Sequence, residues 1–452
     1  MRSGLFGTSG IRGVVGQDIT PGLCHDVGRS LASLLPAGAR VAVAADTRPT
    51  GKGLKEAAVL GLTTSGASVT DWGILPTPAL ALLTKDLGFA AGVMVTASHN
   101  PPEYNGMKLF DGNGMARSGQ QEKEIEDLYK QRLFRQTLPG RVTGRSGGPE
   151  AYYRLLSRRL PTFSPSWRVV VDPGNGAMAG FLSGLLRRLG LEVLPINDEP
   201  DGLFPGRSPE PSEESLGGTV DFLRQQRADI AVCFDGDGDR VAFCDSRGFL
   251  DFNGIMAFLS YLVLKDRPGG TIVTTVETGR TLDTALQPLG ARVVRGQVGD
   301  GPVAHLCRKL GAALGAEPVG VYILPEMGYY PDGIYAFLLL LSRLRTMEDV
   351  RAFIDGQPRL FMRKAKVPCP NEDKEWVARR LGEQVPLPGV QEVNSLDGVR
   401  LELDDAWVLL RPSGTEPVIR VTAEARSVER AEALVGAGVQ YVKSLLSLGV
   451  GA

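Results

Sequence analysis

The sequence predicts an α/β protein with three similar mixed-sheet α/β domains and a smaller C-terminal α+β domain. Two observations lead to this prediction. Apolar, β-branched runs begin at positions 40, 168 and 271. Each run ends near an acidic residue and precedes a helical pattern. After about residue 367 the pattern changes to short strands followed by one long amphipathic helix. Alternating strand and helix signals are typical of α/β units, whereas successive short strands favour an antiparallel sheet.

The three α/β units share one local pattern. Residues 40–45 form a predicted buried strand that ends at Asp46, and residues 54–66 form the helix after it. Residues 168–171 lead in the same way to Asp172 and a glycine-rich turn, and residues 271–276 lead to Glu277. In α/β proteins the carboxyl ends of strands are where functional side chains gather.

The last segment contains predicted strands at 400–403, 406–410 and 418–425, and a closing helix at 427–446. Glycine- and proline-containing stretches predict linkers near 140–148, 251–254 and 364–370. We therefore expect domains at 1–148, 149–250, 251–366 and 367–452.

Composition excludes several function classes. A chain of 452 residues is too long for one core, and its net charge of −1 offers no basic excess for nucleic acid or an anionic membrane. The apolar stretch 255–264 is too short to span a bilayer, and no apolar signal region stands at the N-terminus. The five cysteines are scattered without a C-x-x-C pair, which is typical of reduced thiols. We expect a cytoplasmic monomer or homodimer that acts on a small molecule.

Ser98 lies in the sequence TASHNPP, directly after an apolar run. A serine at a rigid loop tip can act as a nucleophile or carry a phosphoryl group. The G-x-S-x-G signature is absent, and His99 is too close in sequence to be expected to face the Ser98 hydroxyl. The alternative is a polar turn that caps a helix. Lys108 follows closely and could bring an amine to the site.

A second loop, DGDGDR, alternates Asp235, Asp237 and Asp239 with glycines. An extended backbone would point the three carboxylates to one side, where they repel each other unless a cation neutralises them. Ligation by oxygen alone suits Mg²⁺. The alternative is a β-hairpin turn, because Asp-Gly is a hairpin signal.

Two further loops offer donors to an anion. RPSGTEP places Arg411 beside two hydroxyls and a glycine, with Arg420 downstream, and such a set can surround a phosphate. GTSGIRG near the N-terminus is glycine-rich and contains one cation, Arg12. The alternative for each is a simple turn.

Together these segments resemble the α-D-phosphohexomutase family over essentially the whole chain. The match is carried, in family order, by GTSGIRG at Gly7, TASHNPPEYNGMK at Thr96, DGDGDR at Asp235, GAEPVG at Gly315 and RPSGTEP at Arg411. VGD at Val298 also resembles a family element. The resemblance implies four domains with a heart-like outline around a central cleft.

The resemblance also implies roles for individual residues. Ser98 would be a phosphoserine that donates and recovers a phosphoryl group, and an oxygen of that phosphate would join three carboxylates in holding Mg²⁺. The implied metal ligands besides Ser98 are Asp235, Asp237 and Asp239. The other implied catalytic residues are Arg12, Lys108, His99 and Arg240. The implied substrate-binding residues are Thr8, Ser9, Glu317, Val319, Arg411, Ser413, Gly414, Thr415 and Arg420.

The sugar loop bears on the substrate. Val319 stands where the family usually has Ser or Asn, and a competing alignment would use Glu326 in place of Glu317. The G-E-P-x-G form resembles archaeal-type phosphoglucosamine mutases, which implies conversion of glucosamine 6-phosphate to glucosamine 1-phosphate through a hexose 1,6-bisphosphate, for amino-sugar nucleotide biosynthesis. The alternative is a phosphomannomutase/phosphoglucomutase. A Mg²⁺-dependent sugar phosphatase and a sugar-phosphate-binding sensor are the rival functions from other classes.

Overall fold

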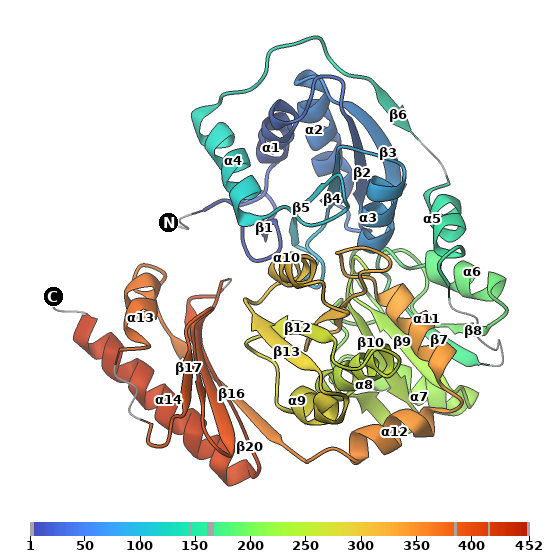
Figure 1. The fold of residues 1–452 in the computed structure, drawn as a ribbon. Helices are drawn as coiled ribbons and strands as arrows, with labels where there is room; N and C mark the ends of the chain where they lie inside the picture. The colour runs from blue at the N-terminus through green and yellow to red at the C-terminus, as the bar shows by residue number, and fades with distance from the viewer. Residues whose placement is uncertain (1–3, 145–146, 161–166, 384–386, 415, 450–452) are drawn as a thin grey trace.

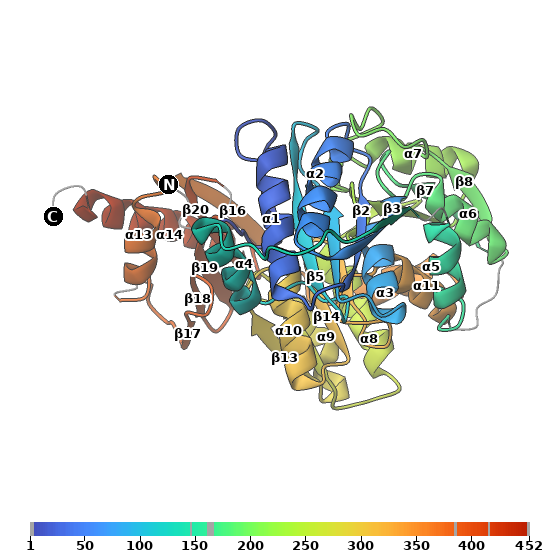
Figure 2. The ribbon, with the colours of Figure 1, turned by 90° about the horizontal axis from the view of Figure 1, so that it is seen from above.

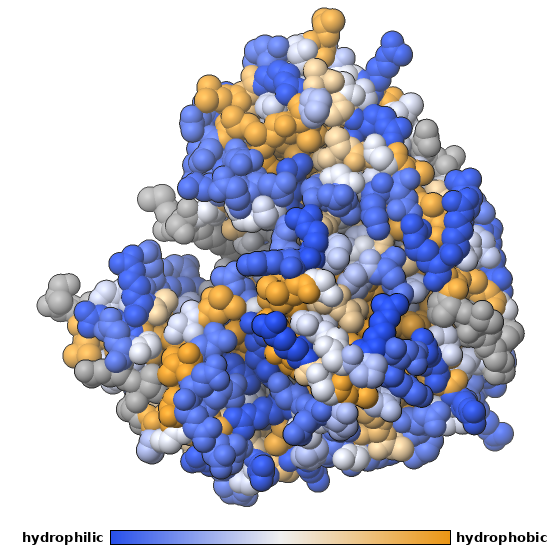
Figure 3. All heavy atoms as spheres, in the orientation of Figure 1, coloured by the Kyte–Doolittle hydropathy of each residue, from blue (hydrophilic) through white to orange (hydrophobic). Residues whose placement is uncertain are grey.

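Four β-sheets follow one another along the chain in the computed structural model (Figure 1). The structure describes residues 4–144, 147–160, 167–383, 387–414 and 416–449. The first three sheets and their helices are arranged around a shared centre, and the fourth lies at one side, as the view from above also shows (Figure 2). The first and the fourth sheets, with their helices, face each other across the notch visible in Figure 3.

Domain I contains a six-stranded mixed sheet in the order β1-β5-β4-β2-β3-β6. Its strands are β1 (Ile11–Val14), β2 (Arg40–Ala45), β3 (Ser68–Ile74), β4 (Ala91–Val95), β5 (Tyr104–Asp111) and β6 (Val142–Gly144). Its helices are α1 (Pro21–Leu34), α2 (Gly51–Thr64), α3 (Thr77–Asp86) and α4 (Gly119–Gln131), and α5 (Gly148–Leu156) leads to domain II. Buried apolar residues on both faces of β2 and β4 explain why helices cover both sides of this sheet.

Domains II and III are smaller versions of the same design. Domain II contains β7 (Arg168–Asp172), α6 (Phe181–Arg188), β8 (Glu192–Pro195), α7 (Gly217–Gln226), β9 (Ile230–Phe234), β10 (Val241–Asp245) and β11 (Gly248–Leu250). Domain III contains α8 (Phe252–Leu264), β12 (Thr271–Thr275), α9 (Thr281–Leu286), the 3₁₀ turn η1 (Gln287–Leu289), β13 (Arg292–Gly296), α10 (Asp300–Leu310), β14 (Leu314–Glu317), β15 (Val321–Ile323), α11 (Gly333–Arg343) and α12 (Met347–Asp355).

The three α/β domains repeat one topology, which confirms the expected similarity. In each, a first strand pairs in parallel with the second on one side and the third on the other. A fourth strand then runs antiparallel beside the third. These sets are β2–β3–β4–β5, β7–β8–β9–β10 and β12–β13–β14–β15. The connection from third to fourth strand carries Ser98 in domain I, the aspartate loop in domain II and the turn after Glu317 in domain III.

Domain IV is built on an antiparallel sheet, as predicted, in the order β16-β20-β19-β18-β17. Its elements are β16 (Phe361–Pro368), α13 (Lys374–Arg380), β17 (Glu392–Asn394), β18 (Val399–Glu402), β19 (Ala406–Pro412), β20 (Val418–Ala425) and α14 (Val428–Gly449). The long closing helix was expected from the amphipathic pattern, and its apolar face packs in a core of domain IV's own.

Regular secondary structure lies within each of the three expected linker stretches. Residues 142–144 form β6, which pairs with β3, and Asp251 is the N-cap of α8 and accepts a hydrogen bond from the Gly254 amide. Residues 361–368 form β16, which pairs with β20 along its whole length. Lysine and proline are common on edge strands, where one side of the backbone needs no partner. The lysines and the proline at 364–368 therefore suggested a linker, although they belong to an edge strand of the sheet.

One large apolar core runs through domains I, II and III, which explains their close association. Domain IV meets domain III through a much smaller cluster centred on Val276, Trp407 and Leu409. No helix in the described part of the chain is long and apolar enough to cross a membrane.

Candidate active site

Ser98 lies where domain I meets domain II. It follows β4 and has a left-handed backbone with φ of 53°, which is uncommon for a residue with a side chain. Its amide donates to Thr96 Oγ1 at 2.8 Å, and its Oγ donates to Asp235 Oδ2 at 2.5 Å. Ser98 at this loop tip is only 1% exposed, because the loop of domain II packs onto it.

The aspartate loop is both a hairpin turn and a carboxylate cluster. It joins β9 to the antiparallel β10, and Gly238 has a φ of +76° in the turn. Asp235, Asp237 and Asp239 each offer an oxygen, and these oxygens lie within 4.8 Å of one another. The carboxylates therefore converge through a tight turn, in which Gly238 supplies the left-handed backbone conformation.

The three carboxylates do not titrate alike. Burial and the neighbouring charges of Asp237 and Asp239 raise the pKa of Asp235. Asp239 also has a raised pKa, from burial and from Asp237. Burial acts on Asp237 in the same direction, but Lys108 outweighs it and lowers the pKa of that carboxyl. Burial and mutual repulsion thus oppose the charged forms of Asp235 and Asp239, and further positive charge in the site would favour them.

Lys108 reaches this cluster from β5. Its Nζ donates to Asp237 Oδ2 at 2.7 Å and to Asp239 Oδ2. Burial opposes its charge, yet the two aspartates raise the pKa of Lys108, so the amine stays positive. Arg12 lies on β1, opposite Gly106 of β5, and its charge also lowers the pKa of Asp237.

His99 and Arg240 complete the centre. Contrary to expectation, His99 faces the Ser98 hydroxyl, with its Nδ1 3.3 Å from Oγ. Burial and the nearby Arg240 lower the pKa of His99, so the imidazole is neutral. Arg240 has a raised pKa because Asp235 and Asp239 outweigh its burial, and it also forms a 3.5 Å ion pair with Glu210.

The sugar loop of domain III places Glu317 at the end of β14, 6% exposed, where its Oε1 accepts from the Gly299 amide at 2.8 Å. Burial and Asp300 raise the pKa of Glu317 to about 8. Glu326, the competing candidate, is exposed. Val319 is partly buried and packs against an apolar cluster, so its side chain has no polar group to offer.

The N-terminal loop connects three domains. Ser9 Oγ donates to Asp300 Oδ1 at 2.5 Å. Thr8 lies close to Gly299, because a Cβ atom added at Gly299 would stand 3.0 Å from Thr8 Cγ2. Thr8 Oγ1 would also lie 3.3 Å from a Cβ at Gly414 of domain IV. The N-terminal loop and the loop of domain IV therefore lie next to each other.

In the loop of domain IV, Arg411 is 8% exposed and forms ion pairs with Asp397 at 3.0 Å and Glu277 at 3.4 Å. Ser413 is buried beside it. Arg420 lies opposite Arg411 in the β19–β20 pair but is more exposed and bonded to Glu416 at 2.9 Å. Thr415, also expected here, lies outside the described residues.

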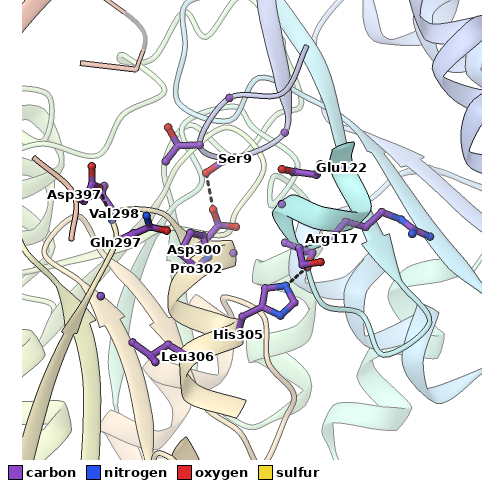
Figure 4. Close-up of a pocket in the computed structure, with 18 of the residues that line it drawn as sticks. Ser9, Arg117, Glu122, Gln297, Val298, Asp300, Pro302, His305, Leu306 and Asp397 are labelled. Atoms are coloured by element: carbon purple, nitrogen blue, oxygen red, sulfur yellow. Dashed lines mark hydrogen bonds between the residues drawn. The ribbon is translucent and has the colours of Figure 1, made fainter. Parts of the chain in front are cut away.

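A cavity of about 730 Å³ opens between domains I, III and IV. Thr8, Ser9, Lys108, Asp300 and Arg411 all line it. Figure 4 shows Ser9 bonded to Asp300 in this cavity, with Glu122 of α4 across from them. Of the predicted substrate-binding residues that the structure describes, five do not line this cavity: Glu317, Val319, Ser413, Gly414 and Arg420.

Several residues that support this site were not predicted from the sequence. Thr77, the first residue of α3, donates from Oγ1 to Asp237 Oδ2 at 2.7 Å and from its amide to the Asp237 carbonyl at 2.9 Å. Glu122 and Asp397 line the cavity. None of these residues belongs to a sequence motif. The only nearby signal in the sequence was Asp46, the acidic residue at which the first predicted strand ends.

Known proteins match the chain along nearly its full length. Family models described as phosphoglucomutase/phosphomannomutase alpha/beta/alpha domains I, II and III match residues 3–136, 157–248 and 251–359, and the model of the C-terminal domain matches 365–437. A protein of Thermococcus kodakarensis named "Probable phosphoglucosamine mutase" is 38% identical, covering 98% of this chain and 99% of its own. Another protein of that organism, named phosphoglucomutase/phosphomannomutase, is 35% identical, with 98% and 99% covered.

A solved structure agrees with these sequences. A phosphoglucomutase/phosphomannomutase family protein from Burkholderia thailandensis superimposes with a TM-score of 0.87 at 27% identity, covering 99% of this chain and 98% of that one. The four domains, with a serine and an acidic triad where domain I meets domain II, define an enzyme of the phosphosugar mutase class. The chain belongs to the phosphoglucomutase/phosphomannomutase family, the α-D-phosphohexomutases, as its motifs indicated.

Proposed function

We propose that this mutase converts glucosamine 6-phosphate to glucosamine 1-phosphate, using a phosphoserine at Ser98 and a hexose 1,6-bisphosphate that serves as intermediate and activator. The phosphoserine proposal rests on one observation, the hydrogen bond from Ser98 Oγ to Asp235 of the acidic triad. The amino sugar is supported by the name of the 38% identical relative and by the E-P-x-G form of the loop that begins at Glu317.

The residues present fit Mg²⁺. Asp237 Oδ1 is buried and has no hydrogen-bond partner among the described residues, although such an atom normally has one. The donor set is entirely carboxylate oxygen, which this hard cation prefers. Asp235, Asp237 and Asp239 would hold the ion, together with an oxygen of the phosphoserine. When bound, the ion would offset negative charge on the phosphoryl oxygens and orient them.

In the proposed transfer, the free hydroxyl oxygen of the hexose phosphate forms a bond to phosphorus while the bond from Ser98 Oγ to phosphorus breaks. Phosphoryl transfer depends mainly on alignment and on stabilising charge that spreads over the phosphoryl oxygens. Lys108, Arg12 and Arg240 supply that positive charge. In this step the proton lost by the sugar hydroxyl ends on the departing Ser98 Oγ, and His99 Nδ1 lies 3.3 Å from that oxygen.

Return of the other phosphate to Ser98 completes the isomerisation. The bisphosphate must present each of its phosphates to Ser98 in turn, so the unreactive phosphate needs a separate binding place. We assign that place to Arg411, Ser413, Gly414 and Thr415 of domain IV, with Arg420 as an outer cation. Thr8 and Ser9 close the cavity beside them, and Glu317 accepts from sugar hydroxyls.

A second substrate preference has one specific observation in its favour. The relative named phosphoglucomutase/phosphomannomutase is 35% identical over the same length, close to the 38% of the first. Neutral hexose phosphates are therefore the competing substrates, with the same chemistry at Ser98.

A coupled mutase assay distinguishes these substrates. It would use Mg²⁺ and the matching 1,6-bisphosphate, with glucosamine 6-phosphate, mannose 6-phosphate and glucose 6-phosphate measured side by side. We expect the largest kcat/KM for the amino sugar. Equal or larger values for the neutral hexoses would make the enzyme a phosphomannomutase/phosphoglucomutase, and steady release of inorganic phosphate would indicate a phosphatase.

A further inference from the structure

Arg48 makes an unusual set of contacts beneath the serine loop. It lies just after β2, and its side chain is fully buried. Nη2 donates to the carbonyls of Ser98, at 2.8 Å, and Asn100, while Nη1 donates to those of Tyr104, at 2.9 Å, and Pro101. Nε donates to Asp46 Oδ2 at 3.1 Å. A guanidinium has five N–H donors, and each one here has an acceptor.

Asp46 links this guanidinium to the other side of the serine loop. The Oδ2 that accepts from Arg48 also accepts from Thr96 Oγ1 at 2.6 Å. Thr96 Oγ1 in turn accepts from the Ser98 amide at 2.8 Å. The amide and the carbonyl of Ser98 are therefore both held by one buried network, which continues to the carboxylate of Asp46.

Backbone strain is concentrated at the same place. Among the described residues, six that are not glycine have positive φ, and Arg132 and Arg227 are ordinary left-handed helix ends. The other four, which lie in the serine loop and in the domain II loops near it, are Ser98, Asn175, Asn197 and Phe204. Asn adopts this conformation readily, whereas at Ser98 and Phe204 it persists only where surrounding contacts hold it, and such residues cluster at functional sites.

Phe204 and Gly236 connect this network to the metal loop. The guanidinium carbon of Arg48 lies 5.1 Å from the centre of the Phe204 ring. A Cβ at Gly236 would stand 2.5 Å from the Ser98 carbonyl oxygen and 3.4 Å from the Phe204 ring. The carbonyl that Arg48 holds is thus in direct contact with the backbone between Asp235 and Asp237.

We propose that Arg48 is a positioning residue for phosphoryl transfer, which with Asp46 and Thr96 holds the strained backbone of Ser98 so that Oγ points at the acidic triad. This inference rests on the proposed role of Ser98 as the phosphoryl carrier. Arg48 acts through Ser98 and does not touch the sugar. Lysine cannot replace it, because a single ammonium nitrogen cannot reach five acceptors spread over both sides of a planar group.

The test compares Arg48→Lys with wild type in a single turnover. Dephosphorylated full-length enzyme is mixed with Mg²⁺ and glucose 1,6-bisphosphate that carries radiolabelled phosphate, and the label on Ser98 is followed over time. We expect transfer about 100-fold slower, since misplacement of a reacting atom by about 1 Å can cost that much. KM for the sugar phosphate in the coupled steady-state assay should stay unchanged, because Arg48 contacts none of the residues assigned to bind it.

Arg351→Lys is the matched control. Arg351 forms a two-pronged ion pair with Asp245 at 2.7 and 2.6 Å and donates to the Gly248 carbonyl at 3.0 Å, away from the serine loop. It should lower Tm without slowing transfer. Wild-type transfer in Arg48→Lys, or a loss that equals the one in Arg351→Lys, would overturn the proposal.

A second pair of variants covers the case in which Arg48→Lys does not fold. Thr96→Val keeps the shape but removes the hydroxyl between Asp46 and the Ser98 amide, whereas Thr96→Ser keeps the hydroxyl. Slow transfer in Thr96→Val with recovery in Thr96→Ser supports the proposal, and equal rates in the two contradict it. No label on Ser98 in the wild-type enzyme would instead refute the proposed function itself.

Discussion

The Oγ of Ser98 and the Oδ2 of Asp235 lie 2.5 Å apart, although the two residues belong to different domains and different sheets. Each stands in the turn between the third and fourth strands of its own unit. The reacting hydroxyl and the acidic triad therefore meet only because the two units pack through one continuous core. This contact is the basis for the first two predictions.

Ser98→Ala should abolish isomerisation while the protein remains folded. Loss of a catalytic nucleophile lowers rates on the order of 10³-fold or more. The lost hydrogen bond to Asp235 should cost only about 1 kcal/mol of stability. The coupled mutase assay and thermal unfolding would be compared with Ser30→Ala, which loses a buried hydroxyl bonded to the Asp26 carbonyl far from the site. Turnover like that of wild type in Ser98→Ala would refute the phosphoserine mechanism.

Asp237→Asn should weaken both activity and the response to Mg²⁺. The substitution removes a negative charge from the triad and leaves Lys108 with one carboxylate fewer. Titration of activity with Mg²⁺ should show a half-saturating concentration at least about tenfold higher, as expected when a buried charge pair worth more than 1.4 kcal/mol is lost. Asp283→Asn, which affects an ion pair with Arg295 in domain III, serves as control. An unchanged metal titration would remove the aspartate loop from the site.

Thermal stability should depend on Glu317 in a defined pH range. Its pKa is raised from 4.5 to about 8 in the folded protein, so the folded state holds this proton more tightly than the unfolded state. The resulting stabilisation is complete below about pH 4.5 and is lost as pH rises through about 8. Between these limits Tm of the wild type should fall relative to Glu317→Gln. Parallel Tm curves for the two proteins would show that Glu317 does not titrate in this range.

Val319→Ser should change the preference among sugars. A hydroxyl at this position would stand two residues after Glu317, in a loop that now offers an apolar side chain. One added hydrogen bond is worth about 1 kcal/mol, or roughly a fivefold change in the ratio of kcat/KM for glucosamine 6-phosphate and glucose 6-phosphate. Val319→Ala separates the effect of the hydroxyl from that of lost packing. If none of the kinetic constants changes, residue 319 does not contact the sugar.

The sequence by itself determined the local elements and the chemical character of each loop. The strand ends at residues 45 and 172 can be recognised because apolar runs stop at an acidic residue. Three aspartates spaced by glycines indicate a site with oxygen ligands, whatever the rest of the chain contains. Periodicity and turn chemistry are local properties, so the repeated units and the antiparallel last domain were predictable. The edges were not, since β6 and β16 became strands through partners far along the chain.

Only the tertiary structure decided which side chains act together. Thr77 bonds to Asp237 and Arg48 holds the Ser98 carbonyl because different strands and domains converge there, and no spacing in the sequence encodes either contact. The burial of Ser98 and the neutral state of His99 have the same origin, because burial and neighbouring charges exist only once the domains have packed. The chemistry of single residues is local, whereas their distances, charges and strain are properties of the assembled fold.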